Sequence, residues 1–412
     1  MVVGAGAAGL LAGLFAARAG VPTLLVETRK EPGAKIRVSG GARCNVLPSA
    51  MEWSDFHSHG SSHSVRNVLM SWPLAQVREF FERDLGIALK QEPSGKLFPV
   101  SEDPREVVVG LLEALARAGA TLVGGFRIVA VRRVEHAGET PFELEAEDGR
   151  RLLARRLCLA TGGLSLPKTG SDGRGFEFAR ALGHEVLPLY PALVPLLTHD
   201  ARWAELAGVS LPVRLSVMRA GKLVEAREGD FLFTHKGFSG PAALDVSWHF
   251  AAPEAASARL EAAWLGRIAP PWEQLLLAPG RHTLSSLLRE HLPRRLAQLL
   301  IARAGLDGEM RTASLTREAR ASLLAELERC ELAIHGNEGY RTAEVTDGGV
   351  PLAMLRTQTL ESRSQPGLYF AGEILDVTGR IGGFNFLWAW VSGRKVGLAV
   401  AAAHAGAAEA NQ

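Results

Sequence analysis

The sequence contains few cysteines and carries little net charge. Three cysteines, Cys44, Cys158 and Cys330, lie far apart in 412 residues, and no C-x-x-C spacing occurs. We therefore expect no disulfide framework, no dithiol redox centre and no metal centre. The formal net charge is +2 at pH 7, and the basic residues are spread along the chain without runs. This balance favours a small-molecule substrate over nucleic acid or an anionic membrane as partner.

The chain also lacks a convincing export or membrane-spanning segment. Its most apolar stretch, residues 2–27, reads VVGAGAAGLLAGLFAARAGVPTLLVE and has no basic residue before Arg18, whereas a signal peptide begins with positive charge. The five glycines of this stretch make it a poor transmembrane helix. We expect a cytoplasmic protein. The very short strand before Gly4 suggests that the natural chain begins a few residues upstream.

Residues 2–27 instead have the order strand, glycine-rich turn, helix, strand and acid. The turn matches G-x-G-x-x-G, and Glu27 follows its last glycine by 18 residues, close to the spacing of a ribose-binding acid. The glycines allow a tight turn, close backbone approach to a pyrophosphate and close helix–strand packing, while the helix start attracts phosphate. Glu27 would repel a 2′-phosphate, which argues against NADP here. The residues predicted to bind a dinucleotide at this corner are Gly4, Gly6, Ala7, Ala8, Gly9, Glu27, Thr28 and Arg29.

The rest of the pattern predicts an α/β protein whose first domain is discontinuous. We expect a loop over 29–48, helices over 65–90, 104–118 and 173–182, and strands over 120–134, 142–147 and 156–160. Short strands follow over 186–260, helices over 283–334, a strand over 368–372 and an apolar helix over 386–404. This order predicts a nucleotide domain of residues 1–185 plus 345–412. It would be interrupted by a β-rich domain, 186–265, and a small helical domain, 266–344.

Several longer strings resemble the BaiN/YhiN-type, aminoacetone-oxidase-like flavoproteins across nearly the whole chain. They are GAKIRVSGGARCNV, LATGG, GSDGRGFEFARALGH, FLFTHKGFSGP and AGEILDVTGRIGGFNFLWAWVSGRKVG. The resemblance implies FAD as cofactor, a Rossmann-like FAD domain of the glutathione-reductase type, a β-rich insertion and a small helical domain. Ala42 stands where a glycine is usual, and Leu387 where glutamine is frequent, so the substrate of one relative should not be transferred.

Three further segments are predicted to hold the FAD. In the loop after the second strand, flexible glycines beside polar side chains suit an extended pyrophosphate–ribityl chain. The start of the last helix would stabilise negative charge on the reduced flavin. The resemblance adds the TGG turn, a backbone contact to adenine and the acid of the AGEILD string. The predicted residues are Lys35, Ser39, Gly40, Gly41, Arg43, Cys44, Asn45, Ile128, Ala160, Thr161, Gly162, Gly372, Glu373, Asp376, Gly382, Gly383, Phe384 and Asn385.

Candidate acids and bases are less distinctive than the coenzyme signals. His235 and Lys236 lie in FTHKGFSGP and Arg380 in DVTGRIGG; a structural role for the histidine is the alternative. We expect an FAD-dependent oxidoreductase that moves a hydride between flavin N5 and an amine or an enone-like molecule. Oxygen or transiently docked NAD(P)H would be the second partner, because no second G-x-G-x-x-G with an acid occurs. An NAD(P)H-dependent reductase of a conjugated double bond and a non-catalytic FAD-binding protein are the alternatives; the sequence does not indicate an oligomeric state.

Overall fold

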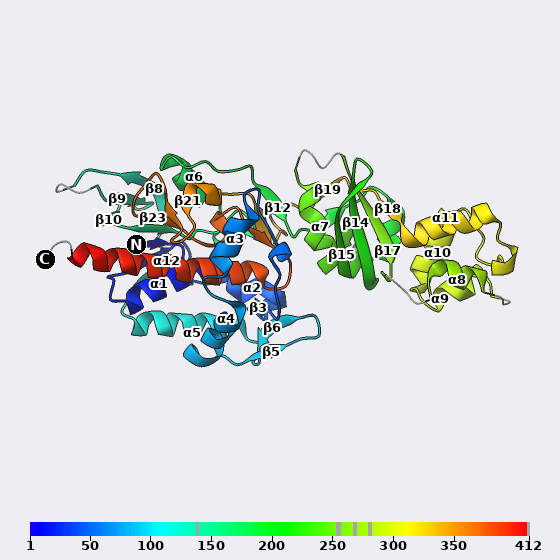
Figure 1. The fold of residues 1–412 in the computed structure, drawn as a ribbon, viewed down its shortest axis with the longest axis horizontal. Coiled ribbons are helices and arrows are strands. Elements are labelled where there is room, and N and C mark those ends of the chain that lie inside the picture. Colours follow the sequence, from blue (N-terminus) through cyan, green and yellow to red (C-terminus); the bar gives the residue numbers. More distant parts are fainter. Residues whose placement is uncertain (137–139, 253–256, 267–269, 279–281, 410–412) are drawn as a thin grey trace. The chain divides into compact units, whose positions relative to one another are not determined.

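The computed structural model describes residues 1–136, 140–252, 257–266, 270–278 and 282–409. The chain divides into two compact units, Met1–Tyr190 with Glu344–Gln412, and Pro191–Ala343 (Figure 1). The sequence pattern predicts these boundaries at 185/186 and 344/345. No helix among the described residues is long and apolar enough to cross a bilayer.

The first unit is built on a seven-stranded sheet in which the five strands from β23 to β7 are parallel. In spatial order its strands are β21 (Leu355–Arg356), β22 (Glu361–Ser362), β23 (Leu368–Phe370), β11 (Leu157–Leu159), β1 (Val2–Val3), β2 (Leu24–Glu27) and β7 (Thr121–Gly124). The chain leaves β1 toward β2 on one side and later returns to β11 on the other. The carboxyl end of β1 is therefore a switch point, where open α/β sheets bind ligands.

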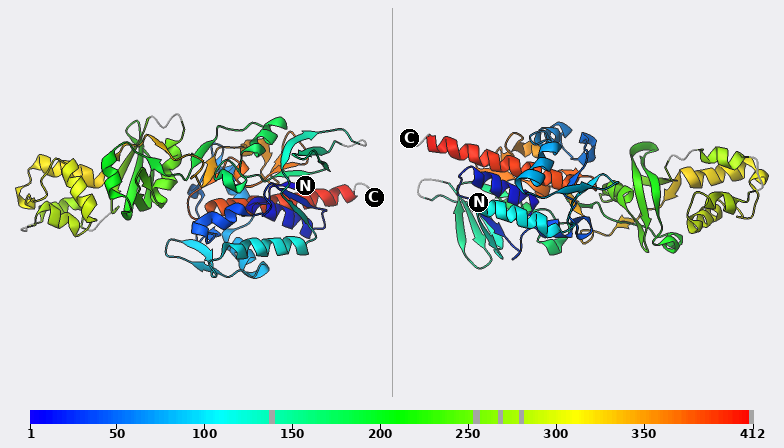
Figure 2. Two further views of the ribbon diagram at one scale, coloured as in Figure 1. Left: turned by 180° about the vertical axis from the view of Figure 1, so that it is seen from behind. Right: turned by 90° about the horizontal axis from the view of Figure 1, so that it is seen from below.

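Two helices of this unit pack closely side by side: α1 (Ala7–Arg18) and α12 (Phe384–Glu409). Figure 2 shows α12, in red, running beside α1, in dark blue, in both views. Glycines of α12 permit this approach, since a Cβ at Gly393 would lie 2.2 Å from the carbonyl oxygen of Ala8, and one at Gly397 would lie 2.7 Å from that of Ala12. Two elements about 380 residues apart in sequence are thus held together beside the glycine-rich turn of residues 4–9.

The first unit also contains further helices and several small sheets. Its further helices are α2 (Ala34–Ala42), α3 (Ser62–Leu69), α4 (Leu74–Glu79), a π-helical turn (Phe80–Asp84), α5 (Pro104–Arg117) and α6 (Arg174–Ala181). Its small sheets comprise β8 (Ile128–Arg133), β9 (Phe142–Ala146) and β10 (Arg151–Ala154); β3 (Leu47–Pro48), β6 (Lys96–Pro99) and β5 (Leu89–Gln91); and β4 (Phe56–His57) with β24 (Thr378–Gly379). Strand β20 (Val345–Asp347) begins its second segment, and β12 (Tyr190–Ala192) crosses the boundary between the units.

The second unit combines an antiparallel sheet and a group of helices over one hydrophobic core. Its strands in spatial order are β18 (Cys330–Leu332), β17 (Ala258–Trp264), β14 (Ser210–Arg219), β15 (Lys222–Phe233), β16 (Gly237–Ser239), β13 (Leu196–Leu197) and β19 (Gly336–Asn337). Its helices are α7 (Pro241–Val246), α8 (Trp272–Leu277), α9 (Leu284–Arg289), α10 (Arg294–Arg303) and α11 (Arg317–Glu328). Trp264 of the sheet and Leu323 of α11 belong to the same core, so the expected β-rich and helical parts are joined.

The structure corrects three expectations about local elements. Residues 29–48 are not all loop, because α2 occupies 34–42 and β3 follows. The expected helix over 65–90 is broken into α3, α4 and the π-helical turn, with Pro73 preceding α4. Residues 120–134 form two strands in different sheets, β7 and β8, with positive-φ Gly125 between them.

Candidate active site

The turn between β1 and α1 requires glycine at two positions for the fold alone. Gly4 has φ +98°, and a Cβ there would lie 2.4 Å from the carbonyl oxygen of Ala160. A Cβ at Gly9 would lie 1.9 Å from the carbonyl oxygen of Gly4. These positions draw α1 against the carboxyl ends of β1 and β11, the close helix–strand packing that the motif predicts.

Gly6 is different, because the protein leaves space beside it. It is the N-cap of α1, with φ −82° and ψ −168°, and no side chain caps the helix there. Apart from its own neighbours in the chain, no residue that the structure describes has an atom within 4 Å of the position of a Cβ at Gly6. A helix start with open space before it fits a pyrophosphate, whose charge the backbone N–H groups and helix dipole would stabilise.

Glu27 lies at this same corner, at the end of β2. Its Oε2 accepts a hydrogen bond from the backbone N–H of Ala5 (2.7 Å), and its Oε1 accepts one from that of Arg29 (3.0 Å). The Arg29 side chain donates to the carbonyl oxygen of Lys168. The structure thus brings the predicted ribose-binding acid to the glycine turn; its contact with FAD remains a prediction.

The segment after β2 forms α2, and the start of α2 lies beside the glycine-rich turn. The N–H of Gly33 donates to the carbonyl oxygen of Ala5 (3.0 Å), which ties the start of α2 to the glycine turn. Within α2 the helix is interrupted at Ser39, Gly40 and Gly41, and both glycines have positive φ. Ala42, in place of the family's usual glycine, also has positive φ, at 62°. The string SGGA therefore forms a kink rather than a regular helix.

The residues that follow this kink differ in how exposed and how reactive they are. Arg43 pairs with Glu92 and lies over the ring of Phe98. Cys44 is fully buried, and burial raises the pKa of its thiol to about 12, so a reactive thiolate is disfavoured. Asn45 is 7% exposed, and its buried Oδ1 has no hydrogen-bond partner in the part of the chain that the structure describes. A buried amide oxygen without a partner is costly in the protein alone, and it fits a donor supplied by a bound coenzyme.

The start of α12 meets this segment. A Cβ at Gly383 would lie 2.6 Å from the backbone of Leu47 and 3.0 Å from Asn45 Oδ1. The side chain of Asn385 both accepts from Gly379 N–H and donates to its carbonyl oxygen, each at 2.8 Å, which fixes the turn before the helix. Ten residues separate Gly383 from Gly393, the position that contacts Ala8, about 15 Å along the helix. The packed helices α1 and α12 therefore connect the glycine-rich turn of residues 4–9 with the turn at Gly382 and Gly383.

Lys35 and Glu373 form a polar cluster between α2 and the 3₁₀ turn Gly372–Ile374. Their ammonium and carboxylate groups are paired, and Lys35 also donates to Ser165 Oγ (2.6 Å). Glu373 Oε1 accepts from Ser165 Oγ (2.7 Å) and from the N–H of Thr346 (3.0 Å). Two residues predicted separately as FAD ligands thus contact one another.

Residues after β11 and at the start of β8 lie beside the glycine-rich turn and Glu27. Ala160 and Thr161 follow β11 directly beside Gly4, and Gly162 has positive φ. Ile128 is buried at the start of β8, just after Phe126, whose N–H donates to the carbonyl oxygen of Glu27. Both segments lie next to the predicted adenosine-binding residues.

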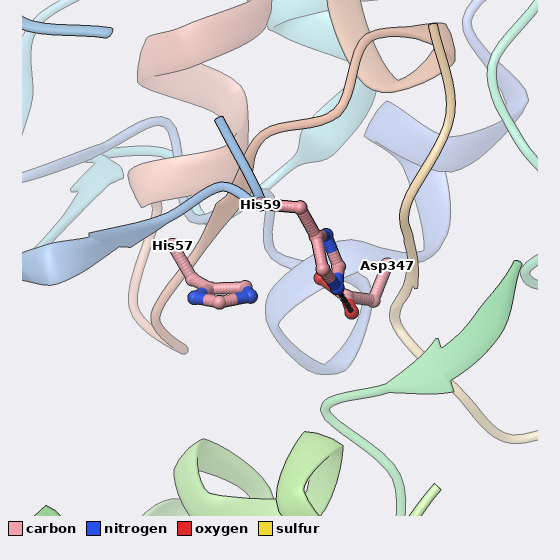
Figure 3. A group of neighbouring side chains, drawn as sticks. All are labelled: His57, His59 and Asp347. Carbon is pink, nitrogen blue, oxygen red and sulfur yellow. Dashed lines mark ion pairs between the residues drawn. The ribbon is translucent and has the colours of Figure 1, made fainter. Parts of the chain in front are cut away.

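A cluster that the sequence analysis missed lies beside β24 and contains His57, His59 and Asp347 (Figure 3). One donor atom from each lies within 4.8 Å of the others. His59 Nδ1 is 2.9 Å from Oδ1 of Asp376, whose Oδ2 accepts from Ser58 Oγ and from the N–H of His59. The H-x-H spacing of His57 and His59 was the available signal. These contacts occupy both carboxylate oxygens of Asp376, and its predicted contact with FAD stays untested.

The predicted catalytic residues fall into different units. Arg380 belongs to the first, where it pairs with Asp55 (3.0 Å). His235 and Lys236 are exposed in the loop between β15 and β16 of the second, and the ammonium of Lys236 lies 3.9 Å from Glu338. Their catalytic roles remain predictions.

A separate cavity of about 310 Å³ opens at the amino ends of β1, β2 and β11. Its lining includes Met1, Thr23, Leu24, Cys158 and His404. Ligands of open α/β sheets bind outside the carboxyl ends of the strands, so this cavity is not part of the candidate site.

Comparison with known proteins agrees with the fold and the corner. The family described as "HI0933-like protein Rossmann domain" matches residues 1–399. The Escherichia coli ribosomal RNA dihydrouridine synthase is 34% identical over 95% of both chains. The 3-dehydro-bile acid delta(4,6)-reductase of Clostridium scindens is 30% identical over 97% of this chain and 98% of its own.

A solved structure shows the same fold at lower identity. The 3-ketosteroid delta1-dehydrogenase of Sterolibacterium denitrificans aligns with a TM-score of 0.51 and 14% identity, over 98% of this chain and 99% of that one. The Rossmann sheet, the glycine-rich turn of residues 4–9 and these relatives together identify the chain as an FAD-dependent oxidoreductase. More particularly, the chain belongs to the HI0933-like family, which confirms the resemblance to BaiN/YhiN-type flavoproteins.

Proposed function

We propose that this protein is an FAD-dependent reductase that adds two hydrogens across a carbon–carbon double bond conjugated with a carbonyl. The observation that carries the proposal is the shared chemistry of its full-length relatives. Dihydrouridine is uridine with a saturated ring double bond next to a carbonyl, and a delta(4,6)-reductase of a 3-oxo steroid removes double bonds conjugated with that oxo group. In both, the carbon distal to the carbonyl is the electrophile that accepts hydride.

The residues at the coenzyme corner fit FAD. Gly6 with the start of α1 would hold the pyrophosphate, Glu27 the adenosine ribose, and Asn45 with the start of α12 the flavin end. Bound FAD would supply a hydride donor at N5. The N–H groups at the start of α12, with the helix dipole behind them, would stabilise negative charge at the ring by about 0.3–2 kcal/mol.

NAD(P)H is the proposed electron donor. The sequence has one G-x-G-x-x-G followed by an acid, and we assign that motif to FAD. NAD(P)H would therefore dock transiently. The sequence predicts no nucleic-acid partner, but two relatives are named for ribosomal RNA, so RNA stays a candidate. Uridine in RNA and a free enone are both candidate substrates.

Anaerobic flavin reduction tests this proposal. NADH or NADPH should bleach the flavin absorbance, and an acceptor should restore it while gaining two hydrogens by mass spectrometry. The acceptors are an unmodified ribosomal RNA transcript and a 3-oxo-4,6-diene steroid; saturated analogues of each are the controls. Bleaching by aminoacetone or another amine, together with reoxidation by air alone, would instead identify an oxidase.

A further inference from the structure

The His57–His59–Asp347 cluster has the donor set of a metal site. His57 is in β4, paired with Thr378 of β24, and Asp347 ends β20. His59 Nε2 lies 3.7 Å from Asp347 Oδ2, and the histidine rings are 5.0 Å apart. Among the residues that the structure describes, this is the one group with three histidine, cysteine or acidic donors within such reach.

Hydrogen bonds around the cluster orient its donor atoms. The buried carboxylate of Asp376 lies at Nδ1 of His59, which favours a proton there and leaves the lone pair of Nε2 directed toward Asp347. The hydroxyl of Thr378 donates to Asp347 Oδ1 (2.9 Å), leaving Oδ2 for a further partner. A carboxylate on the far nitrogen of a histidine and a fixed ligating carboxylate are what metal sites use to orient their ligands.

Charge also favours a cation here. The side chains of Asp347 and Asp376 are 4% and 1% exposed, and both reach one imidazole. Buried carboxylates require compensating positive charge. The nearby cation Lys35 is paired with Glu373. A divalent cation between neutral imidazoles and Asp347 would balance both carboxylates.

We propose that His57, His59 and Asp347 bind a divalent transition-metal ion, with Asp376 and Thr378 as positioning residues. Two imidazoles and one carboxylate suit Zn²⁺, and three protein ligands leave one position open to water or a carbonyl oxygen. With bonds of about 2.1 Å, tetrahedral donors lie roughly 3.4 Å apart, so the side chains must draw together by about 1 Å. The side chain of His59 is 41% exposed and has room to do so. The inference departs from the expectation of no metal centre, which rested on cysteine spacing, and is independent of the proposed reaction.

Zinc titration of the chelator-treated, tag-free flavoprotein tests the site. Isothermal calorimetry should show one equivalent of Zn²⁺, with affinity reduced at least 100-fold in H59Q and in D347N. D376N keeps the three proposed ligands but removes the carboxylate that orients His59 and one of the two buried negative charges, and should weaken binding by roughly 10–100-fold. The matched control is H199Q: His199 stacks on His335 in the second unit, 3.4 Å between ring centroids, and its replacement should leave the affinity unchanged.

Retained FAD absorbance and an unchanged melting temperature will show that each variant is folded. The proposal is overturned if the wild type takes up no stoichiometric zinc, or if H59Q and D347N bind it as the wild type does. It is equally overturned if H199Q loses the binding. Stoichiometric zinc in a protein that fails to reduce any enone would refute the proposed function and leave this site standing.

Discussion

At the scale of single residues, Gly6 and Gly9 have different reasons to be glycine, and this difference can be tested. A Cβ at Gly6 would meet no atom of the described residues beyond its chain neighbours, and the backbone there is extended, so Gly6→Val should cost at most about 1 kcal/mol of stability as a poorer N-cap. The side chain would stand where the pyrophosphate approaches, and FAD affinity should fall at least tenfold. Fluorescence titration of the apoprotein with FAD measures this.

Gly9→Ala is the matched variant. Its methyl group would collide with the carbonyl oxygen of Gly4, so it should destabilise the fold by about 1–3 kcal/mol or more even without coenzyme. Equal loss of apoprotein stability in both variants would show that Gly6 is structural and would remove the argument for a phosphate there.

Another residue-scale prediction concerns pH. His184 is 4% exposed, with Nε2 2.8 Å from Ser362 Oγ, and burial lowers its pKa below the usual 6.5. The unfolded chain therefore binds more protons, and stability should fall as pH decreases below about 6.5, by at most about 1.4 kcal/mol per pH unit. Urea unfolding at pH 7 and pH 5 should show a smaller difference in H184Q than in wild type. An identical pH dependence in both would place the titrating group elsewhere.

At the scale of elements, the contact between α1 and α12 holds together the two parts of the predicted FAD site. Gly393→Ala would place a methyl group 2.2 Å from the carbonyl oxygen of Ala8, and should cost about 1–3 kcal/mol and weaken FAD retention together. Gly406 lies in the same helix with nothing within 4 Å, so Gly406→Ala should be neutral or stabilise by up to about 1 kcal/mol. Thermal melts with and without FAD separate the two. A neutral Gly393→Ala would mean that the helices do not need to approach so closely.

Elements with strong local signals could be predicted, and those that depend on distant partners could not. Asp103 and Pro104 mark the start of α5, and Asp103 does accept from the N–H of Arg105. Gly40 and Gly41 mark the break in α2, but the short helical turns around them have no such signal, and a Cβ at Gly40 would meet Phe98 and Asn45, which only the fold brings near. The His57–His59 spacing was visible, but Asp347 lies 288 residues from His59, and only the fold brings it near.

At the scale of the whole molecule, the two units have separate cores. Residues of the glycine corner and of α12 belong to one hydrophobic cluster, and Trp203, Phe231 and Leu323 belong to another. The change of pattern near 186 and 345 predicts that the first unit is interrupted there. It could not show that the inserted sheet and helices share one core, because that depends on contacts between segments such as β17 and α11.

Separate cores predict two unfolding transitions that respond differently to coenzyme. Every residue predicted to bind FAD lies in the first unit, so FAD at 100 times its dissociation constant should stabilise that unit by about 2.7 kcal/mol. For a unit of this size the shift is roughly 5–10 °C, and the transition of residues 191–343 should not move. Differential scanning calorimetry of the full chain measures both, with Gly6→Val as the control in which the shift should fall by about half or more. If FAD raised both transitions equally, the assignment of every FAD-binding residue to the first unit would be wrong, whereas melting in a single step would contradict the prediction that the two units unfold separately.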